Sequence, residues 1–202
     1  MRKLVFSFYL LPAFVCLLLI VTSTQAQTLS DCLTTFPPLT KPGVNGLSFS
    51  KDGKTLVVAS VDGKIRFVEM SSGTVQRMLS GHTNAVYTAV FSPDEKLLAS
   101  SSRDNTARIW DLSSGRELHK FTGFRCSVKA IAFSPNSRTV AATGNDGMIK
   151  LWDVKTGTEL HSLVHVNSKD IDMSVYAIAF DRAGKKIYGA NGDGTISEWD
   201  VA

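Results

Sequence analysis

The sequence has few of the residues that metal or redox chemistry requires. Its 202 residues include three cysteines and four histidines, and no histidine pairs with a cysteine at the short spacing of a zinc site. It has no phosphate-binding loop, nucleophile elbow or zinc-protease motif. The run Asn191–Thr195 begins like a calcium loop, but Ala202 stands where the closing carboxylate is needed. We therefore expect no metal site and no cofactor.

A sustained helical pattern is absent after the first 26 residues, and those residues have the pattern of a secretory signal. Arg2 and Lys3 form a positive start, residues 4–21 are a nearly unbroken apolar run, and small residues precede Ala26. We expect cleavage after Ala26 and a secreted or periplasmic protein. The alternative is an uncleaved membrane anchor, since the apolar run is just long enough to span a bilayer.

The chain that this cleavage leaves, residues 27–202, has little net charge. The formal charge of +4 falls to +2 when Arg2 and Lys3 are removed. A near-neutral balance gives no electrostatic footprint for nucleic acid or for an anionic membrane surface. We therefore expect neither as a partner, unless segment 4–21 stays attached.

Residues 43–202 contain four copies of one unit, marked in three independent ways. Each marker recurs at spacings of 42, 42 and 47 residues. The first marker is a phenylalanine that ends an apolar run: Phe49, Phe91, Phe133 and Phe180. The second is an aspartate in a turn: Asp62, Asp104, Asp146 and Asp193. The third is a Trp-Asp position: Val68-Glu69, Trp110-Asp111, Trp152-Asp153 and Trp199-Asp200.

Each unit consists of short apolar runs of strand length, bounded by turn residues. In the second unit the predicted strands are 86–91, 97–100, 107–110 and 117–121. Asp-Gly pairs predict type I′ hairpins, which need positive φ, at Asp62-Gly63, Asp146-Gly147 and Asp193-Gly194. These patterns predict an all-β fold.

The stretch from Gly81 to Asp111 opens with Gly-His, closes with Trp-Asp and holds three apolar runs between them. It resembles a WD40 repeat, whose roughly 40–45 residues fold as one four-stranded propeller blade. The resemblance implies four β-propeller blades. It also implies a scaffold that binds other proteins rather than an enzyme.

Three arrangements of the four repeats remain open. Residues 27–42 form a connector in which 31–36 could be a strand, and the last repeat stops after its third strand. The resemblance implies that such a strand can complete the last blade and close a four-blade ring. Glu198 argues against closure, because an exposed strand explains a charge there. We favour an open arc, or a half-ring that forms a homodimer. The counterparts of Glu198 are Phe67, Ile109 and Leu151.

Two cysteines remain after cleavage, in a compartment that permits disulfides. Cys32 belongs to the connector and Cys126 to the start of the third repeat. Their separation in different blades favours two unpaired thiols over a bridge.

The resemblance further implies a network of His, Ser or Thr, Asp and Trp in each blade. In the second repeat these are His82, Ser100 or Ser102, Asp104 and Trp110. The set resembles a catalytic triad, but a buried serine bonded to an indole predicts a structural role. We therefore expect no catalytic residue. The other repeats, which hold Val68, Phe124 and Val166 at network positions, keep parts of it at Asp62, Asp146, Trp152, Asp193 and Trp199.

The longer spacing before the fourth repeat comes from a five-residue insertion between His165 and Met173. In the family such loops lie with the Asp turns at one end, which often binds partners. An ordinary solvated loop is the alternative. The candidate partner-binding residues are Arg103, Arg125, Lys169, Asp170 and Asp172.

The leading hypothesis is an exported, non-enzymatic module that binds a protein partner. A second hypothesis is an enzyme or small-ligand binder in a central channel, although the first strands 130–133 and 176–180 are apolar. A third is an incomplete propeller that functions only as a homo-oligomer.

Overall fold

The computed structural model describes residues 43–165 and 173–201, which belong to the second of two compact units, Phe36–Ala202. The signal segment, the connector with its expected strand, and residues 166–172 lie outside the described residues. Within the described ranges, no helix is long and apolar enough to cross a membrane.

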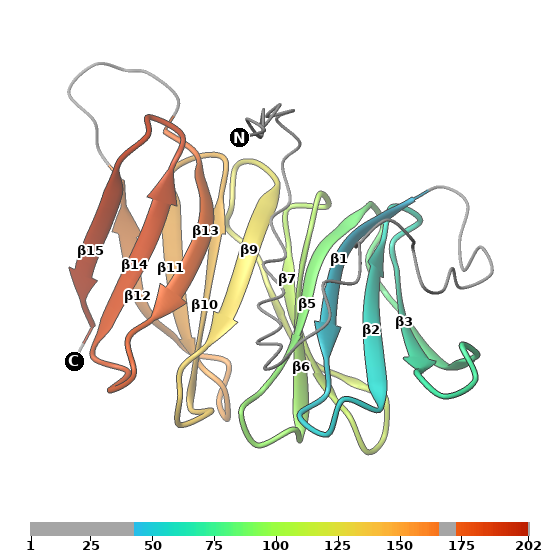
Figure 1. Cartoon of the computed structure of the whole chain (residues 1–202). Helices are drawn as coiled ribbons and strands as arrows, with labels where there is room; N and C mark the ends of the chain where they lie inside the picture. The colour runs from blue at the N-terminus through green and yellow to red at the C-terminus, as the bar shows by residue number, and fades with distance from the viewer. Residues whose placement is uncertain (1–42, 166–172, 202) are drawn as a thin grey trace, which may run out of the picture. The chain divides into compact units, whose positions relative to one another are not determined.

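The described residues form four antiparallel sheets, which we call blades 1 to 4 (Figure 1). The predicted all-β fold is confirmed. Strands pair in chain order within each blade, and blade 4 has three strands where the others have four. Blade 1 contains β1 (Val44–Phe49), β2 (Thr55–Ser60), β3 (Lys64–Glu69) and β4 (Val75–Ser80). Blade 2 contains β5 (Val86–Phe91), β6 (Leu97–Ser102), β7 (Ala107–Asp111) and β8 (Glu117–Phe121). Blade 3 contains β9 (Val128–Phe133), β10 (Thr139–Gly144), β11 (Met148–Asp153) and β12 (Glu159–Val164). Blade 4 contains β13 (Val175–Phe180), β14 (Lys186–Asn191) and β15 (Ile196–Asp200).

The Asp-Gly hairpins are not type I′ turns, so that prediction was wrong. Gly63 has a φ of 79°, but Asp62 is not among the described residues with positive φ. The Gly63 N–H bonds to the Ser60 carbonyl, which closes a turn centred on Val61 and Asp62. A turn followed by one left-handed residue is the pattern of a three-residue hairpin loop. A Cβ at Gly63 would also lie 2.9 Å from the His82 carbonyl oxygen of blade 2, so the hairpin packs closely against the next blade.

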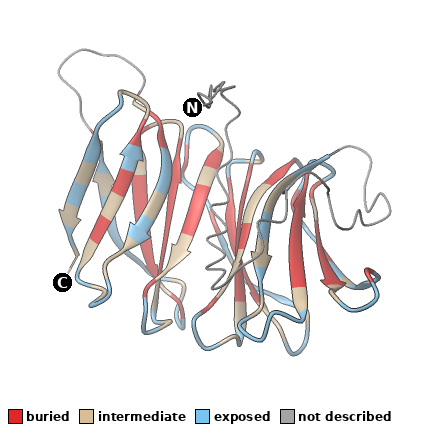
Figure 2. Cartoon of the chain, viewed as in Figure 1, coloured by how far each residue is buried: buried red, intermediate tan, exposed pale blue. Residues whose placement is uncertain are grey.

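The inner blades bury both faces of their sheets. On blade 2, Leu98 and Trp110 pack toward blade 1, whereas Ala99 and Ile109 pack toward blade 3. The inner strands β1, β5, β9 and β13 follow one another as neighbours. Figure 2 shows that buried residues concentrate in the central strands of the blades. Alternate residues of one strand therefore belong to two different cores, which explains the apolar runs in the sequence.

Side-chain hydrogen bonds also link successive blades. The Asn45 amide donates to the Val86 carbonyl at 2.8 Å, and the Ser101 hydroxyl donates to the Lys129 carbonyl at 3.3 Å. Thr143 bonds to the Val175 carbonyl at 3.4 Å. Each bond joins a blade to the inner strand of the next one and fixes their spacing.

The face of blade 4 that points away from blade 3 is charged, as the sequence suggested for Glu198. The Glu198 carboxylate lies 2.5 Å from Lys186 Nζ, and both side chains are more than 40% exposed. Hydrogen bonds from Lys186 and then Tyr188 lower the pKa of Glu198. The counterparts of Glu198 in the other blades are buried apolar residues: Phe67, Ile109 and Leu151.

The face of blade 1 that points away from blade 2 is apolar instead. Leu47 and Phe49 are 47% and 49% exposed there. The strand register places Val75 and Met78 on the same face, and both are exposed. Leu56 and Val58, which pair with Phe49 and Leu47 on β1, are buried. The two end blades therefore differ in chemistry.

Replacing Glu198 with leucine is expected to promote self-association. The change removes the ion pair with Lys186 and extends an apolar patch that already includes the exposed Ile196. Light scattering after size exclusion should show a solution mass that rises with concentration more steeply than for the wild type.

The matched control is Lys120→Leu, which adds the same side chain to an exposed position of a four-stranded blade. It should keep the wild-type mass. Identical masses for Glu198→Leu and the wild type at every concentration would show that the charge does not limit association.

Candidate functional site

The four turn aspartates are the polar feature common to all blades. In each hairpin between the second and third strands, one carboxylate oxygen accepts the backbone N–H two residues later, at 3.0 to 3.2 Å. This bond holds the hairpin in its turn conformation. The aspartates are Asp62, Asp104, Asp146 and Asp193.

In blades 2 and 3 the second oxygen of this carboxylate reaches the loop that enters the blade. Asp104 Oδ2 accepts the Thr83 N–H at 3.0 Å and lies 2.8 Å from His82 Nδ1. Asp146 Oδ2 accepts the Arg125 N–H at 2.8 Å. One side chain therefore ties two separate loops together at the same end of the blade.

Blade 1 uses the second oxygen differently. Asp62 Oδ2 lies 2.6 Å from Arg66 Nη2, and Arg66 also donates to Ser60 at 3.0 Å. The hydrogen bond from Arg66 is the main cause that lowers the pKa of Asp62. Here the carboxylate stabilises its own hairpin and the adjoining strand.

The network is complete in blade 2. The Trp110 indole N–H donates to Ser100 Oγ at 2.9 Å, and Ser100 Oγ lies 2.8 Å from His82 Nε2. Ser102, the alternative hydroxyl, bonds instead to the Ala85 carbonyl at 2.9 Å. Ser100 is therefore the network residue.

Proton positions in this network follow from burial. Burial lowers the pKa of His82, and the bond to Asp104 opposes that shift without cancelling it, so the imidazole is neutral near pH 7. Burial alone would raise the pKa of Asp104, but hydrogen bonds from Thr106, His82 and Thr83 lower it to about 2. A neutral His82 donates from Nδ1 to the ionised Asp104 and accepts at Nε2 from the Ser100 hydroxyl.

This geometry does not present Ser100 as a nucleophile. Its side chain is fully buried, and its oxygen accepts the indole N–H while its proton points to His82. A substrate carbonyl therefore has no path to the oxygen, and the donor and acceptor groups are already used.

The family model of the WD domain, G-beta repeat matches residues 30–68, 73–111 and 115–153, more than half of the chain. The chain belongs to the WD40 family. The stretches 73–111 and 115–153 each contain the last strand of one blade and the first three strands of the next. Blade 4 lies outside the matched stretches. A comparison with curated proteins gave no match.

Blade 4 contains a partial network that the sequence reasoning missed. The repeat spacing predicts Val166 at the histidine position, but His165 is the residue that lies 3.2 Å from Asp193 Oδ2 and 3.1 Å from Ser197 Oγ. Ser197 is on the third strand of the blade, whereas Ser100 of blade 2 is on the second. The signal available in the sequence was a histidine one residue before the expected position.

Blade 3 fills the equivalent positions with apolar groups. Phe124 stands at the position of His82, and Trp152 stacks on Phe121 with ring centroids 4.3 Å apart. Trp199 of blade 4 packs against Ile187 in the core shared with blade 3. Blades 3 and 4 therefore have the aromatic packing without the complete hydrogen-bond chain.

Two of the five candidate partner-binding residues are described, and both are exposed. Arg103 follows β6, and its N–H bonds to the Ala85 carbonyl at 2.8 Å. Arg125 is held by Asp146 as given above. Cys126 beside it is exposed and forms no disulfide with a described residue, and Cys32 lies outside the described range. Lys169, Asp170 and Asp172 also lie outside it.

The calcium-like run Asn191–Thr195 folds as a turn, because the Gly194 N–H bonds to the Asn191 carbonyl at 3.1 Å. In the described part of the chain, no three His, Cys, Asp or Glu side chains gather as a metal site would need.

Ser100→Ala is expected to destabilise the fold by about 2 kcal/mol, because it leaves the buried Trp110 N–H and His82 Nε2 without partners. Urea unfolding should show a lower midpoint at an unchanged slope. Ser80→Ala, at an exposed position of β4, is the control and should match the wild type. A wild-type midpoint for Ser100→Ala would contradict the structural role.

Acid should weaken the fold through His82. Its pKa is lowered by burial, so below about pH 6.5 the unfolded chain binds a proton that the native chain does not. The unfolding free energy should therefore fall as pH drops from 7 to 5. Asp104 should add a further loss as the pH falls from 3.8, the ordinary pKa of an aspartate, to about 2.

His82→Phe, which installs the residue type of blade 3, should flatten the profile between pH 7 and 5. His161→Phe removes an exposed imidazole and should leave the slope as in the wild type. Equal slopes for all three proteins would assign the acid sensitivity to other groups.

Proposed function

We propose that this chain is an exported, non-enzymatic scaffold that binds another protein through the loops at the Asp-turn end of its blades. WD40 repeats in general act as protein-interaction scaffolds. The choice of the Asp-turn end as the binding surface is supported by the two roles of the turn carboxylates. They fix the hairpins and the entering loops together, with Arg103 and Arg125 exposed beside them.

Fixed loops suit binding for a physical reason. Less conformational entropy is lost on association when the backbone is already ordered by hydrogen bonds. Arginine is enriched at protein interfaces, and neither Arg103 nor Arg125 forms an ion pair with another described residue. A partner with carboxylates or carbonyls at matching positions would complete their hydrogen bonding.

The buried state of the His82 network supports the non-enzymatic part of the proposal. The N-terminal residues support export, because a positive start, an apolar run and a small residue at Ala26 form a signal pattern.

A second candidate role is assembly with another copy of the chain. The exposed apolar face of blade 1, with Leu47, Phe49 and Met78, favours it. The wild-type solution mass tests this role directly, because a monomer at every concentration would contradict it.

The interaction proposal is tested on exported protein, which we expect to begin at Gln27. Partner proteins bound to the wild type are captured by cross-linking and identified by mass spectrometry. The double variant Arg103→Glu with Arg125→Glu should no longer capture them. The reversal places like charges where acidic partner groups would dock. Lys51→Glu with Lys120→Glu, two exposed lysines elsewhere, should retain the partners.

If both double variants retain the same proteins as the wild type, the Asp-turn end is not the binding surface. An exported protein that still carries residues 1–26 would contradict the cleavage.

A further inference from the structure

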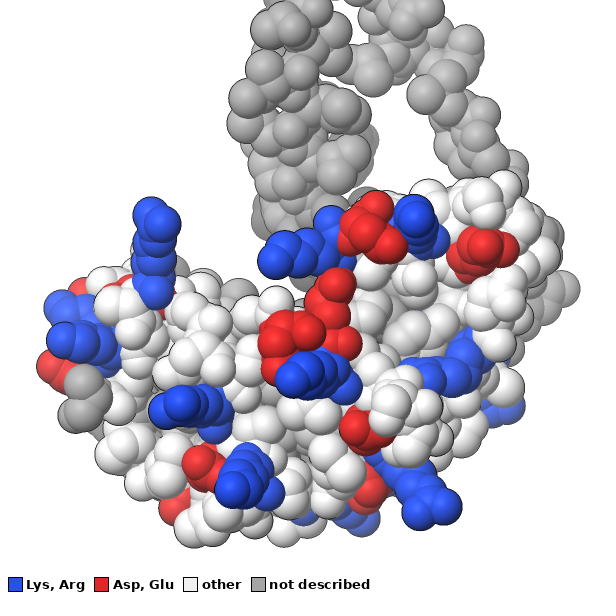
Figure 3. Space-filling view, turned by 90° about the horizontal axis from the view of Figure 1, so that it is seen from below, with Lys and Arg blue, Asp and Glu red and all other residues white. Residues whose placement is uncertain are grey.

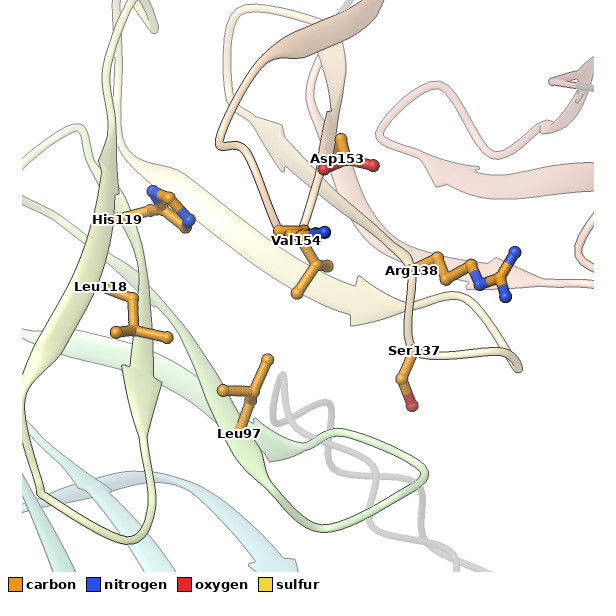
Figure 4. Close-up of a pocket in the computed structure, with 8 residues that line it drawn as sticks. Leu97, Leu118, His119, Ser137, Arg138, Asp153 and Val154 are labelled. Atoms are coloured by element: carbon orange, nitrogen blue, oxygen red, sulfur yellow. The ribbon is translucent and has the colours of Figure 1, made fainter.

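A pocket of about 700 Å³ lies between blades 2 and 3, at the end opposite to the Asp turns. Leu97 and Leu118 of blade 2 and Val154 of blade 3 form its apolar part (Figure 4). Arg138 and the pocket lie at the β9–β10 turn, whereas Asp146 is in the β10–β11 turn at the other ends of these strands. The pocket is therefore separate from the loop surface of Arg103 and Arg125.

The repeats explain why this pocket exists. The position of His119 in blade 2 is held by Arg77 in blade 1, 42 residues earlier. At the junction of blades 1 and 2, the Arg77 guanidinium lies 4.6 Å from the Phe67 ring centroid and donates to the Leu112 carbonyl. The arginine thus covers that junction.

The residues that face Arg77 and His119 across the two junctions have the same backbone bond within their own blades. The Leu112 N–H bonds to the Lys96 carbonyl at 3.0 Å, and the Val154 N–H bonds to the Arg138 carbonyl at 2.8 Å. His119 instead stacks on Phe121, with ring centroids 5.9 Å apart. The imidazole also lies against Gly157 of the β11–β12 turn, where an added Cβ would be 2.6 Å from Nδ1. His119 therefore contacts blade 3, but it is shorter than an arginine and leaves a pocket above Val154.

The rim of the pocket carries two basic side chains and one acidic side chain. Arg138 and Lys155 are exposed, and neither forms an ion pair with another described residue. Asp153 is also on the rim, and its Oδ1 accepts the Thr156 N–H and hydroxyl at 2.7 and 2.9 Å. These hydrogen bonds, and to a smaller extent the charge of Lys155, lower the pKa of Asp153, so one negative charge stands beside the two basic groups. Basic and acidic side chains are interspersed over the end of the blades seen in Figure 3.

The strand beside the pocket favours a peptide as the occupant. Leu118 and His119 belong to β8, which is the last strand in the order of blade 2. One edge of β8 is therefore not paired with another described strand, and its backbone groups can bind an extended chain.

We propose that this pocket binds an extended peptide segment of a protein partner, with a leucine-sized side chain on Leu97, Leu118 and Val154. An adjacent carboxylate of the peptide binds Arg138 and Lys155. A pocket of this volume is in the usual range for binding sites. The site extends the scaffold role to the opposite end of the blades and does not depend on Arg103 or Arg125.

The probes are two fluorescein-labelled peptide pools, each eight residues long with random flanks, one with a fixed central Leu-Glu pair and one with Leu-Lys. Fluorescence anisotropy measures their binding to the whole chain. The Leu-Glu pool should bind the wild type at least about tenfold more tightly than the Leu-Lys pool.

His119→Arg places at the junction of blades 2 and 3 the residue type that Arg77 provides at the junction of blades 1 and 2. The variant should therefore fold normally. It should bind the Leu-Glu pool about tenfold more weakly, or weaker still. Arg138→Glu with Lys155→Glu should reverse the preference between the pools. Lys54→Glu, at an exposed position of the β1–β2 turn in blade 1, should leave both affinities unchanged.

Equal binding of the Leu-Glu pool to the wild type and to His119→Arg, at matched thermal stability, would overturn the proposal. The absence of any preference between the pools for the wild type would also overturn it. Neither result would affect the loop surface, which is tested by the charge reversal at Arg103 and Arg125.

Discussion

The turn aspartate is the constraint on which the rest of the fold depends. Its two oxygens point to different parts of the chain: one closes a hairpin, and in blades 2 and 3 the other receives an amide from the loop that enters the blade. A carboxylate can accept several hydrogen bonds at once, and an asparagine or serine offers fewer acceptor sites. Asp104 and Asp146 thus couple local turn geometry to the spacing between blades.

The repeats show that one buried position can be filled in two ways. In blade 2 the position holds His82, and the chain of bonds through Ser100 satisfies every polar atom. In blade 3 Phe124 and Ala142 occupy the equivalent sites, and Trp152 packs on aromatic rings. In blade 2 the buried imidazole, hydroxyl and indole groups thus have partners, and in blade 3 phenylalanine and alanine place no polar side-chain atom at the two positions.

The sequence predicted the strands well because each strand has a local signal, an apolar run between turn residues. The predicted strand 117–121 has the same bounds as β8. The predicted strand 97–100 is two residues shorter than β6, which ends at Ser102. Features that depend on distances between repeats were harder to predict. The five-residue insertion shifted the register at His165, and its hydroxyl partner, Ser197, comes from a different strand. The predicted turn type was wrong because the pair Asp62-Gly63 fits both a type I′ turn and a three-residue loop. Packing against blade 2 favours the three-residue loop.

The pocket between blades 2 and 3 shows how a repeat protein gains a site. Successive blades have the same backbone bonds, so a junction changes mainly through the side chains that cover it. Arg77 donates a hydrogen bond to a carbonyl of the next blade, whereas the shorter His119 packs between Phe121 and Gly157. One substitution between repeats therefore exposes an apolar floor while the scaffold stays intact. Because the Asp turns lie at the other end of the strands, such a change does not disturb the network around His82. The two ends can diverge independently.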